Sequence, residues 1–263
     1  LESFEKEVNV VFKWLTLAIR QPIVAVLGHV DSGKTSILDK IRGTGVQSRE
    51  AGGITQHIGA SFLPDETIKK ICGSLYEKLG KSETKLPGIL VIDTPGHEVF
   101  TNLRARGGSA ADIAILVVDI NRGLQPQTNE SLKILESRKV PFVVALNKVD
   151  MISGWQKNDM PLVSQAIKSQ STPVQTTIDE QIYNVVGALS ILGYQSEAFY
   201  RVQDFSKEVS IVPISARTGV GIPELLGVLV GLTEQFLKKK LEQEEKSTRG
   251  IILEVNDEVG LGP

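Results

Sequence analysis

The chain has 263 residues, and 29 Lys and Arg against 31 Asp and Glu give a formal net charge of −2. A charge so close to zero excludes a globally basic nucleic-acid-binding protein. Hydrophobic residues make up 41% and charged residues 23%, which is typical of a globular protein and excludes extended disorder. The single cysteine, Cys72, excludes an intrachain disulfide and a four-thiolate zinc site.

The sequence carries no signal for a membrane or for secretion. The longest apolar runs, such as residues 113–118, are well short of the roughly 18 residues that a membrane-spanning helix requires. The N-terminus lacks a basic stretch followed by a long apolar run and a small-residue cleavage site. Together with the single cysteine, these features favour a cytoplasmic protein with no membrane partner.

Strands and helices are expected to alternate along the chain. Short β-branched runs bounded by Gly, Pro, Asn or Asp predict buried parallel strands at residues 23–27, 89–92, 113–119, 142–147 and 211–214. Apolar residues at helical spacing predict helices at residues 35–42, 128–138 and 224–245. The alternation predicts an α/β fold with a doubly wound, mostly parallel sheet.

Three segments lie outside this alternation. Apolar residues at helical spacing predict an N-terminal amphipathic helix over residues 1–20. Residues 151–208 form a polar, glutamine-rich insertion, expected to be helical around residues 178–192, within a main domain of residues 21–246. Residues 247–263 predict one further strand followed by turn residues, so we expect them to begin a second, truncated domain.

A phosphate-binding loop follows the first predicted strand. Residues 28–35 read GHVDSGKT, which matches G-x-x-x-x-G-K-[ST] between a strand and a helix. The N–H groups at the start of that helix favour phosphate, Lys34 would reach the β- and γ-phosphates, and the Thr35 hydroxyl would bind Mg²⁺. The fold is therefore expected to be that of a P-loop nucleoside triphosphatase. The expected nucleotide contacts of this loop are Asp31, Ser32, Gly33, Lys34, Thr35 and Ser36.

A base-reading motif, NKVD at residues 147–150, follows the predicted strand 142–147. The Asp150 carboxylate can accept hydrogen bonds from both N1–H and the 2-amino group of guanine, whereas adenine would leave this charged acceptor unpaired. Asn147 would hold the loop, and the Lys148 stem would cover the base. Residues Ser215, Ala216 and Arg217 follow the last strand, where the Ala216 N–H could contact guanine O6.

Two further segments predict a magnesium and water site. Asp93, in the DTPGH segment at residues 93–97, would hold Mg²⁺ through water, and Gly96 would let its N–H approach the γ-phosphate. His97 would orient the attacking water. Thr55 lies in a glycine-bearing loop that could close over Mg²⁺ and the γ-phosphate, so Lys34, Thr55 and His97 are the expected catalytic residues.

These residues together resemble the translational GTPases, in which G-H-V-D-[HS]-G-K-[ST] and D-T-P-G-H occur together. The segment at residues 51–60, AGGITQHIGA, resembles the initiation-factor branch of that group. The insertions at residues 61–87 and 151–208 are similar to those of archaeal and eukaryotic translation initiation factor 5B. The resemblance covers about residues 21–263, and it implies that residues 247–263 begin a β-barrel.

The resemblance implies GTP hydrolysis stimulated by the GTPase centre of the large ribosomal subunit during subunit joining, by a monomeric factor. It also implies that Val30 and Ile54 form a hydrophobic gate that keeps His97 out of the site. Asp31 and the Gly53 carbonyl would bind a monovalent cation, Na⁺ or K⁺. Initiator tRNA would bind only through later domains that this chain lacks.

Three alternatives stay open at this point. An elongation-type translational GTPase would share the phosphate and base motifs. An ATP-driven P-loop enzyme is supported by the phosphate loop alone and opposed by the NKVD motif. A scaffold that binds nucleotide without hydrolysis would carry the same binding residues.

Overall fold

The structure is a computed structural model that describes residues 18–42, 59–73, 75–76, 86–93 and 111–243. Within these residues a seven-stranded sheet has the order β3-β4-β2-β5-β6-β8-β7. Its strands are β2 (Ile23–Gly28), β3 (Gly59–Pro64), β4 (Gly88–Asp93), β5 (Ile113–Asp119), β6 (Phe142–Asn147), β7 (Ser196–Ala198) and β8 (Val209–Pro213). All neighbouring strands are parallel except β3, which pairs antiparallel with β4.

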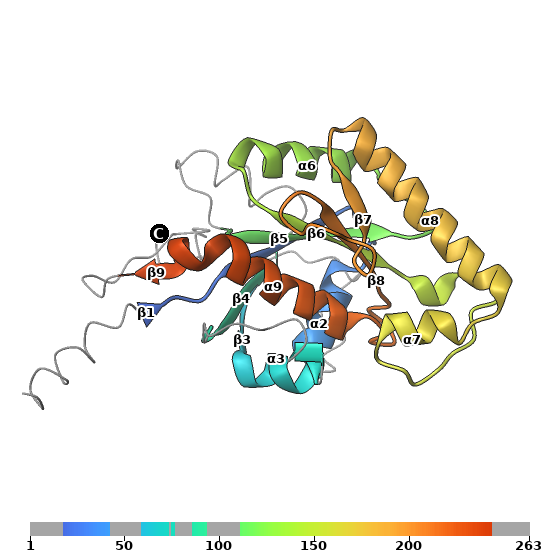
Figure 1. Ribbon diagram of the computed structural model, residues 1–263, viewed down its shortest axis with the longest axis horizontal. Helices are drawn as coiled ribbons and strands as arrows, with labels where there is room; N and C mark the ends of the chain where they lie inside the picture. Colours follow the sequence, from blue (N-terminus) through green and yellow to red (C-terminus); the bar gives the residue numbers. More distant parts are fainter. Residues whose placement is uncertain (1–17, 43–58, 74, 77–85, 94–110, 244–263) are drawn as a thin grey trace, which may run out of the picture.

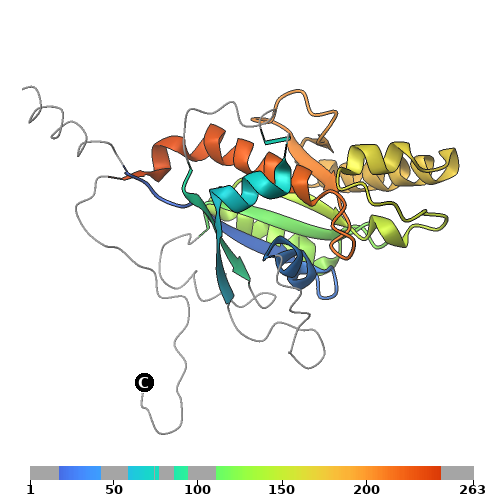
Figure 2. The same ribbon diagram turned by 90° about the horizontal axis from the view of Figure 1, so that it is seen from below.

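Helices cover both faces of the sheet (Figures 1 and 2). One face carries α2 (Lys34–Arg42), α3 (Asp65–Cys72) and α9 (Ile222–Leu241), and the other carries α6 (Pro126–Arg138) and α8 (Thr172–Ile191). The shorter α7 (Val163–Lys168) lies beside the start of α9. The predicted doubly wound, mostly parallel α/β fold is therefore confirmed.

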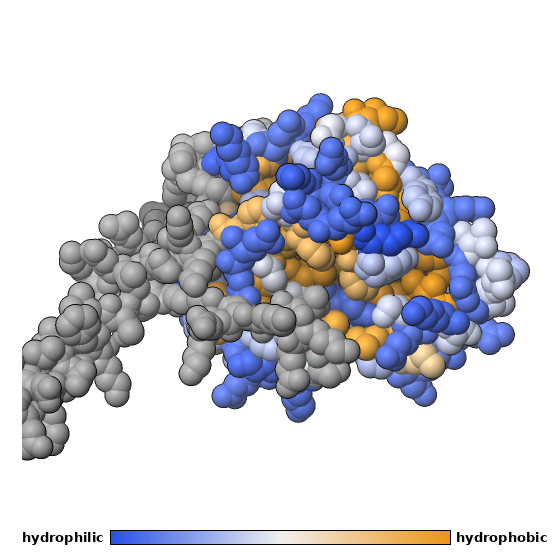
Figure 3. Space-filling model, in the orientation of Figure 1, coloured by the Kyte–Doolittle hydropathy of each residue, from blue (hydrophilic) through white to orange (hydrophobic). Residues whose placement is uncertain are grey.

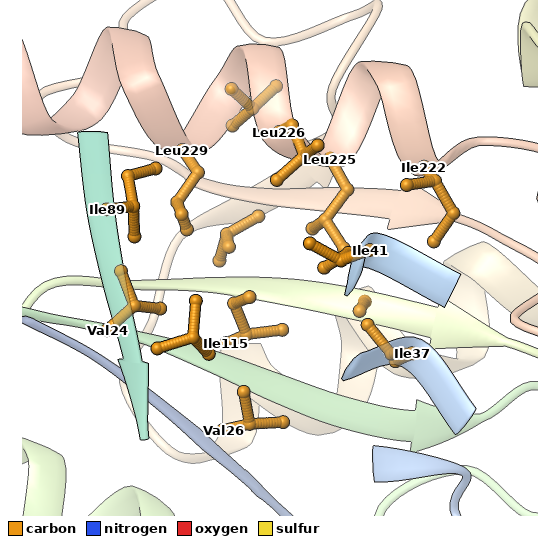
Figure 4. Close-up of a cluster of buried hydrophobic side chains, with 14 of the residues drawn as sticks. Val24, Val26, Ile37, Ile41, Ile89, Ile115, Ile222, Leu225, Leu226 and Leu229 are labelled. Atoms are coloured by element: carbon orange, nitrogen blue, oxygen red, sulfur yellow. The ribbon is translucent and has the colours of Figure 1, made fainter. Parts of the chain in front are cut away.

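Alternate residues of the central strands pack against opposite helix layers, which explains the continuous apolar runs in the sequence. On β2, Val24 and Val26 face α2 and α9, whereas Ala25 and Leu27 face α6 and α8. Figure 4 shows the first of these layers, where Leu225 and the other apolar side chains of α9 meet those of the sheet. The two buried layers hold the carboxyl ends of the strands in fixed positions for the site.

The structure corrects three sequence-based expectations. Ala18–Ile19 form strand β1, which pairs antiparallel with β9 (Glu242–Gln243), so neither the helix expected over residues 1–20 nor the one over 224–245 covers its whole range. The physical reason is the pairing itself, because each short strand satisfies backbone hydrogen bonds of the other in an extended conformation that a helix cannot adopt. The rest of the predicted N-terminal helix, residues 1–17, lies outside the described residues.

The third correction concerns segments expected only as insertions. Residues 59–72, most of which fall in the insertion expected at 61–87, form the edge strand β3 and helix α3. The insertion at 151–208 is helical as expected, but it also adds β7 to the opposite edge of the sheet. The strand expected within 247–263 lies outside the described residues.

The surface in the view of Figure 3 is largely hydrophilic, with an apolar patch at the C-terminal end of α8. There Ile191 is 87% exposed and Leu192 is 40% exposed. Among the described helices, none is both long and apolar enough to cross a lipid bilayer.

Candidate functional site

The phosphate loop turns tightly between β2 and α2, and two glycines make that turn possible. Gly28 has φ +149° and Gly33 has φ +94°, which are values that other residues rarely adopt. A Cβ at Gly28 would lie 2.3 Å from the Val117 carbonyl oxygen, and a Cβ at Gly33 would lie 2.3 Å from Asn147 Nδ2. The loop backbone therefore lies directly against the sheet and against the base-reading motif.

Lys34, Thr35 and Ser36 form the first turn of α2, so its N–H groups point toward the loop. The Lys34 ammonium donates hydrogen bonds to the carbonyl oxygens of Gly28, at 3.1 Å, and His29, at 2.9 Å. This places a positive charge over the loop, at the helix end where phosphate is favoured. The buried Ser32 Oγ has no hydrogen-bond partner among the described residues.

Asp31 and Val30 form the exposed rim of the phosphate loop. Asp31 has φ +62° and its side chain faces solvent. Val30 is 37% exposed, and its N–H donates to Gln127 Oε1 at 3.1 Å. Both residues therefore lie on the solvent-facing side of the loop, and their predicted roles in cation binding and in the gate stay predictions.

Asn147 joins the phosphate loop to the base-reading residues. Its Nδ2 donates to the Ser32 carbonyl oxygen at 2.8 Å, and its Oδ1 accepts from the Ala216 N–H at 2.9 Å. The side chain is buried, with 2% exposed, at the end of β6. One amide therefore sets the distance between two loops that are far apart in the sequence.

Lys148 is fixed against the neighbouring strand end. Its backbone has φ +73°, and its ammonium lies 2.8 Å from Asp119 Oδ2 at the end of β5. Asp119 Oδ1 also accepts the N–H of Asn121 at 2.9 Å. This ion pair holds the Lys148 side chain against the carboxyl end of β5.

Asp150 lies in the short 3₁₀ turn Val149–Met151 (η2), which the Val149 N–H ties to the Ile214 carbonyl oxygen at 3.1 Å. Its side chain is 5% exposed, and Arg217 Nε lies 3.0 Å from its Oδ2. Arg217 is 75% exposed, and this contact lacks the geometry of a hydrogen bond. Asp150 thus presents a buried carboxylate oxygen beside an exposed cation, which suits recognition of a hydrogen-bond donor.

The loop of residues 215–221 contains Ala216, whose N–H is predicted to contact guanine, and we therefore call it the guanine loop; it connects β8 to α9. Ser215 Oγ accepts the N–H of Thr218 at 3.1 Å, and the Ser215 N–H donates to the Val220 carbonyl oxygen at 2.9 Å. These bonds curl the loop so that Ala216 faces Asn147. Asp150, Arg217 and Thr218 are among the residues that line a cavity of about 730 Å³.

The structure thus brings the predicted phosphate-loop and base-reading residues to one edge of the sheet, at the carboxyl ends of β2, β6 and β8, as a doubly wound fold requires. Asp93 ends the neighbouring strand β4, opposite Val26 of β2. The other predicted site residues, Thr55, Gly53, Ile54, Gly96 and His97, lie outside the described residues.

Two groups that face this edge were not among the predicted residues. Asp119 pairs with Lys148, and Gln127 accepts the Val30 N–H. The position of Asp119 at the end of a predicted strand next to the NKVD strand is a signal that could have identified it. No local signal identifies Gln127, because its contact depends on how α6 packs.

The residues present fit a guanine nucleotide. The loop offers a lysine ammonium and a helix N-terminus for phosphates, and it holds a buried Ser32 hydroxyl without a partner in the described part of the chain. The buried Asp150 carboxylate fits a base that presents two donors. Within the described residues, no cluster of three or more His, Cys, Asp and Glu side chains could hold a metal ion by itself.

The comparisons with known proteins agree with this geometry. The model of the elongation factor Tu GTP binding domain matches residues 20–235. The probable translation initiation factors IF-2 of Thermococcus onnurineus and Methanopyrus kandleri are each 55% identical to the chain over 246 residues. Each match covers 93% of this chain and 41% of the relative, so the chain spans about two fifths of their length.

Solved structures give the same result. The crystal structure of GDP-bound aIF5B from Aeropyrum pernix has a TM-score of 0.81 and 51% sequence identity, over 93% of this chain and 41% of that chain. Bacterial selenocysteine-specific elongation factor EF-Sec, at a TM-score of 0.51 and 23% identity over 83% of this chain and 29% of that chain, shares the fold. The resemblance to the initiation-factor branch is thereby confirmed, and the chain belongs to the family of the elongation factor Tu GTP binding domain.

Proposed function

We propose that the chain is the GTP-binding and GTP-hydrolysing part of a translation initiation factor. The observation that carries this proposal is the Asn147 amide, which bonds both the phosphate loop and the guanine loop beside the buried Asp150 carboxylate. The names of the archaeal relatives, which are initiation factors IF-2 and aIF5B, supply the process. The factor acts in the cytoplasm on the ribosome, at the GTPase centre of the large subunit.

The described residues bind and orient GTP in this proposal. Lys34 and the first turn of α2 bind the β- and γ-phosphates, because the positive charge and the N–H groups of the helix start favour them. Asp150 selects guanine, since adenine would leave its buried carboxylate without a hydrogen-bond donor, whereas guanine supplies two. Ser215, Ala216 and Lys148 surround the base.

Mg²⁺, when bound, neutralises charge that develops on the phosphates. Thr35 would hold it directly with Thr55, and Asp93 through water. Asp31 and the Gly53 carbonyl would hold a monovalent cation. His97 would orient the attacking water, and Val30 with Ile54 would keep that histidine away until the ribosome moves them.

In this proposal the chain acts as a monomeric switch module with no membrane partner. Initiator tRNA would contact other parts of the complete factor. Residues 247–263 would begin the following β-barrel.

A nucleotide titration tests the assignment. Calorimetry with GTP, GDP and ATP in the presence of Mg²⁺ should give tight binding of both guanine nucleotides and little binding of ATP. Equal affinity for ATP would contradict the role of Asp150 and favour an ATP-driven enzyme. A single-turnover assay separates a hydrolase from a nucleotide-binding scaffold, because the scaffold would release GTP unchanged.

A second experiment tests His97 in the complete factor. His97→Ala should leave nucleotide affinity nearly intact and abolish ribosome-stimulated hydrolysis, because it removes the water-orienting group and no binding contact. An unchanged stimulated rate would remove His97 from this role.

A further inference from the structure

The guanine loop packs against the polar insertion through a small buried cluster. Val220 of the loop is 4% exposed and contacts Val163 and Ala166 of α7, which are fully buried. Trp155, Ile167 and Phe199 of the insertion pack around these three residues. A solvent-exposed insertion with no packing role would not bury apolar side chains against the guanine loop.

Backbone and carboxylate contacts join the same two segments. The Gly221 N–H donates to the Pro161 carbonyl oxygen at 2.9 Å, and the Ser164 N–H donates to Glu224 Oε1 at 3.4 Å. Glu224 is 1% exposed in the first turn of α9, and burial raises the pKa of its carboxyl. These contacts tie the start of α7 to the start of α9, which lie side by side in Figure 1.

The loop needs support because its own backbone is unusual. Gly219 and Gly221 have φ +93° and φ +81°, and a Cβ at Gly221 would lie 2.4 Å from the Pro213 carbonyl oxygen. Glycine backbone also has more freedom to lose than that of any other residue. The side of the loop that faces the nucleotide site is held by Asn147 at Ala216, and the opposite side is held by the insertion.

We propose that residues 155–168 of the insertion hold the guanine loop in place and thereby set the affinity for the guanine base. Val163 and Glu224 are then positioning residues, because they act on the base through the loop and not by touching it. The inference rests on the proposed function, since it assumes that Ala216 and Asp150 contact guanine.

Two valine substitutions of equal chemistry test it on the full 263-residue chain. Val163→Ala removes two methyl groups from the cluster at the guanine loop, and Val185→Ala does the same in the α8 core, where the side chain is 1% exposed. Both substitutions should lower the stability of the fold by a similar amount, which thermal unfolding measures. Stopped-flow fluorescence at constant Mg²⁺ then measures the rate at which a fluorescent GDP analogue is released, which depends on how firmly the guanine base is held.

Val163→Ala should release GDP about fivefold faster or more, whereas Val185→Ala should stay within about twofold of the original chain. Competition by inorganic pyrophosphate, which reads the phosphate loop alone, should be the same in both variants. Equal acceleration in the two variants would show a general effect of lower stability and overturn the inference. No acceleration in either would overturn it as well.

A second pair covers the case in which Val163→Ala does not fold. Glu224→Ala removes the acceptor for the Ser164 N–H and should speed GDP release, whereas Glu224→Gln keeps an acceptor oxygen and should restore it. Identical release rates in these two variants would contradict a positioning role. If the original chain itself fails to bind GDP, the proposed function fails instead, so the two failures are distinguishable.

Discussion

Replacing Asn147 by alanine removes the connection between the phosphate loop and the guanine loop. The side chain is 2% exposed and makes hydrogen bonds of 2.8 and 2.9 Å to Ser32 and Ala216. Each bond contributes about 0.5–1.5 kcal/mol net, and each buried backbone group left without a partner costs about 1–3 kcal/mol. The combined loss is therefore on the order of 3 kcal/mol.

If the free energy of GDP binding is weakened by half of that loss, the dissociation constant for GDP rises about tenfold. Calorimetry gives this constant, and urea unfolding without nucleotide gives the change in stability. Thr233→Val is the control, because it removes a buried hydrogen bond to the Leu229 carbonyl oxygen on α9, away from both loops. An affinity of Asn147→Ala within about twofold of the control would refute the reasoning that this amide couples the loops.

Three further predictions concern Gly33, Cys72 and Glu224. Gly33→Ala should weaken GDP binding about tenfold or more in calorimetry, because its φ is +94° and its Cβ would lie 2.3 Å from Asn147 Nδ2; unchanged affinity would contradict the close approach. Cys72 is 4% exposed and burial raises its thiol pKa to about 12, so iodoacetamide at pH 8 should label the unfolded chain and spare the native one in mass spectrometry. Burial also raises the pKa of Glu224, so the neutral form stabilises the fold below the ordinary pKa of 4.5, and this contribution is lost as pH rises through the higher folded pKa. Urea unfolding from pH 4 to 7 should therefore show Glu224→Gln gaining on the original chain as pH rises, whereas a constant difference would contradict the shift.

The central part of the sheet could be predicted from sequence because its strands are buried on both faces. β5 is buried at every position, and such strands read as continuous apolar runs. The edge strand β3 contains Phe62, which is 50% exposed, and its pairing depends on β4, about 25 residues further along the chain. A strand of that kind has no clear local pattern, which explains why it was expected only as part of an insertion.

The phosphate and base motifs could be identified from sequence for another reason: each is a short segment in which residue types at a fixed spacing determine what the loop can bind. The tight backbone at Gly28 and Gly33 follows from the motif itself. The bond from Asn147 to the Ser32 carbonyl oxygen does not, since it links residues 115 positions apart in the chain. Predicting it requires knowing that β2 and β6 lie on either side of β5.

The polar composition of residues 151–208 does not indicate that part of this insertion packs against the guanine loop. A glutamine-rich segment predicts a solvated surface, yet Gln170 is 5% exposed. Its Oε1 accepts the Gln156 N–H at 2.7 Å, and its Nε2 donates to the Gln156 carbonyl oxygen at 3.0 Å. This reciprocal pair closes the loop from 156 to 170, which carries Pro161 and Val163 to the guanine loop. A buried amide whose hydrogen bonds are all formed is stable in only one arrangement. Gln170 therefore fixes the loop in the position in which Val163 packs against Val220 of the guanine loop.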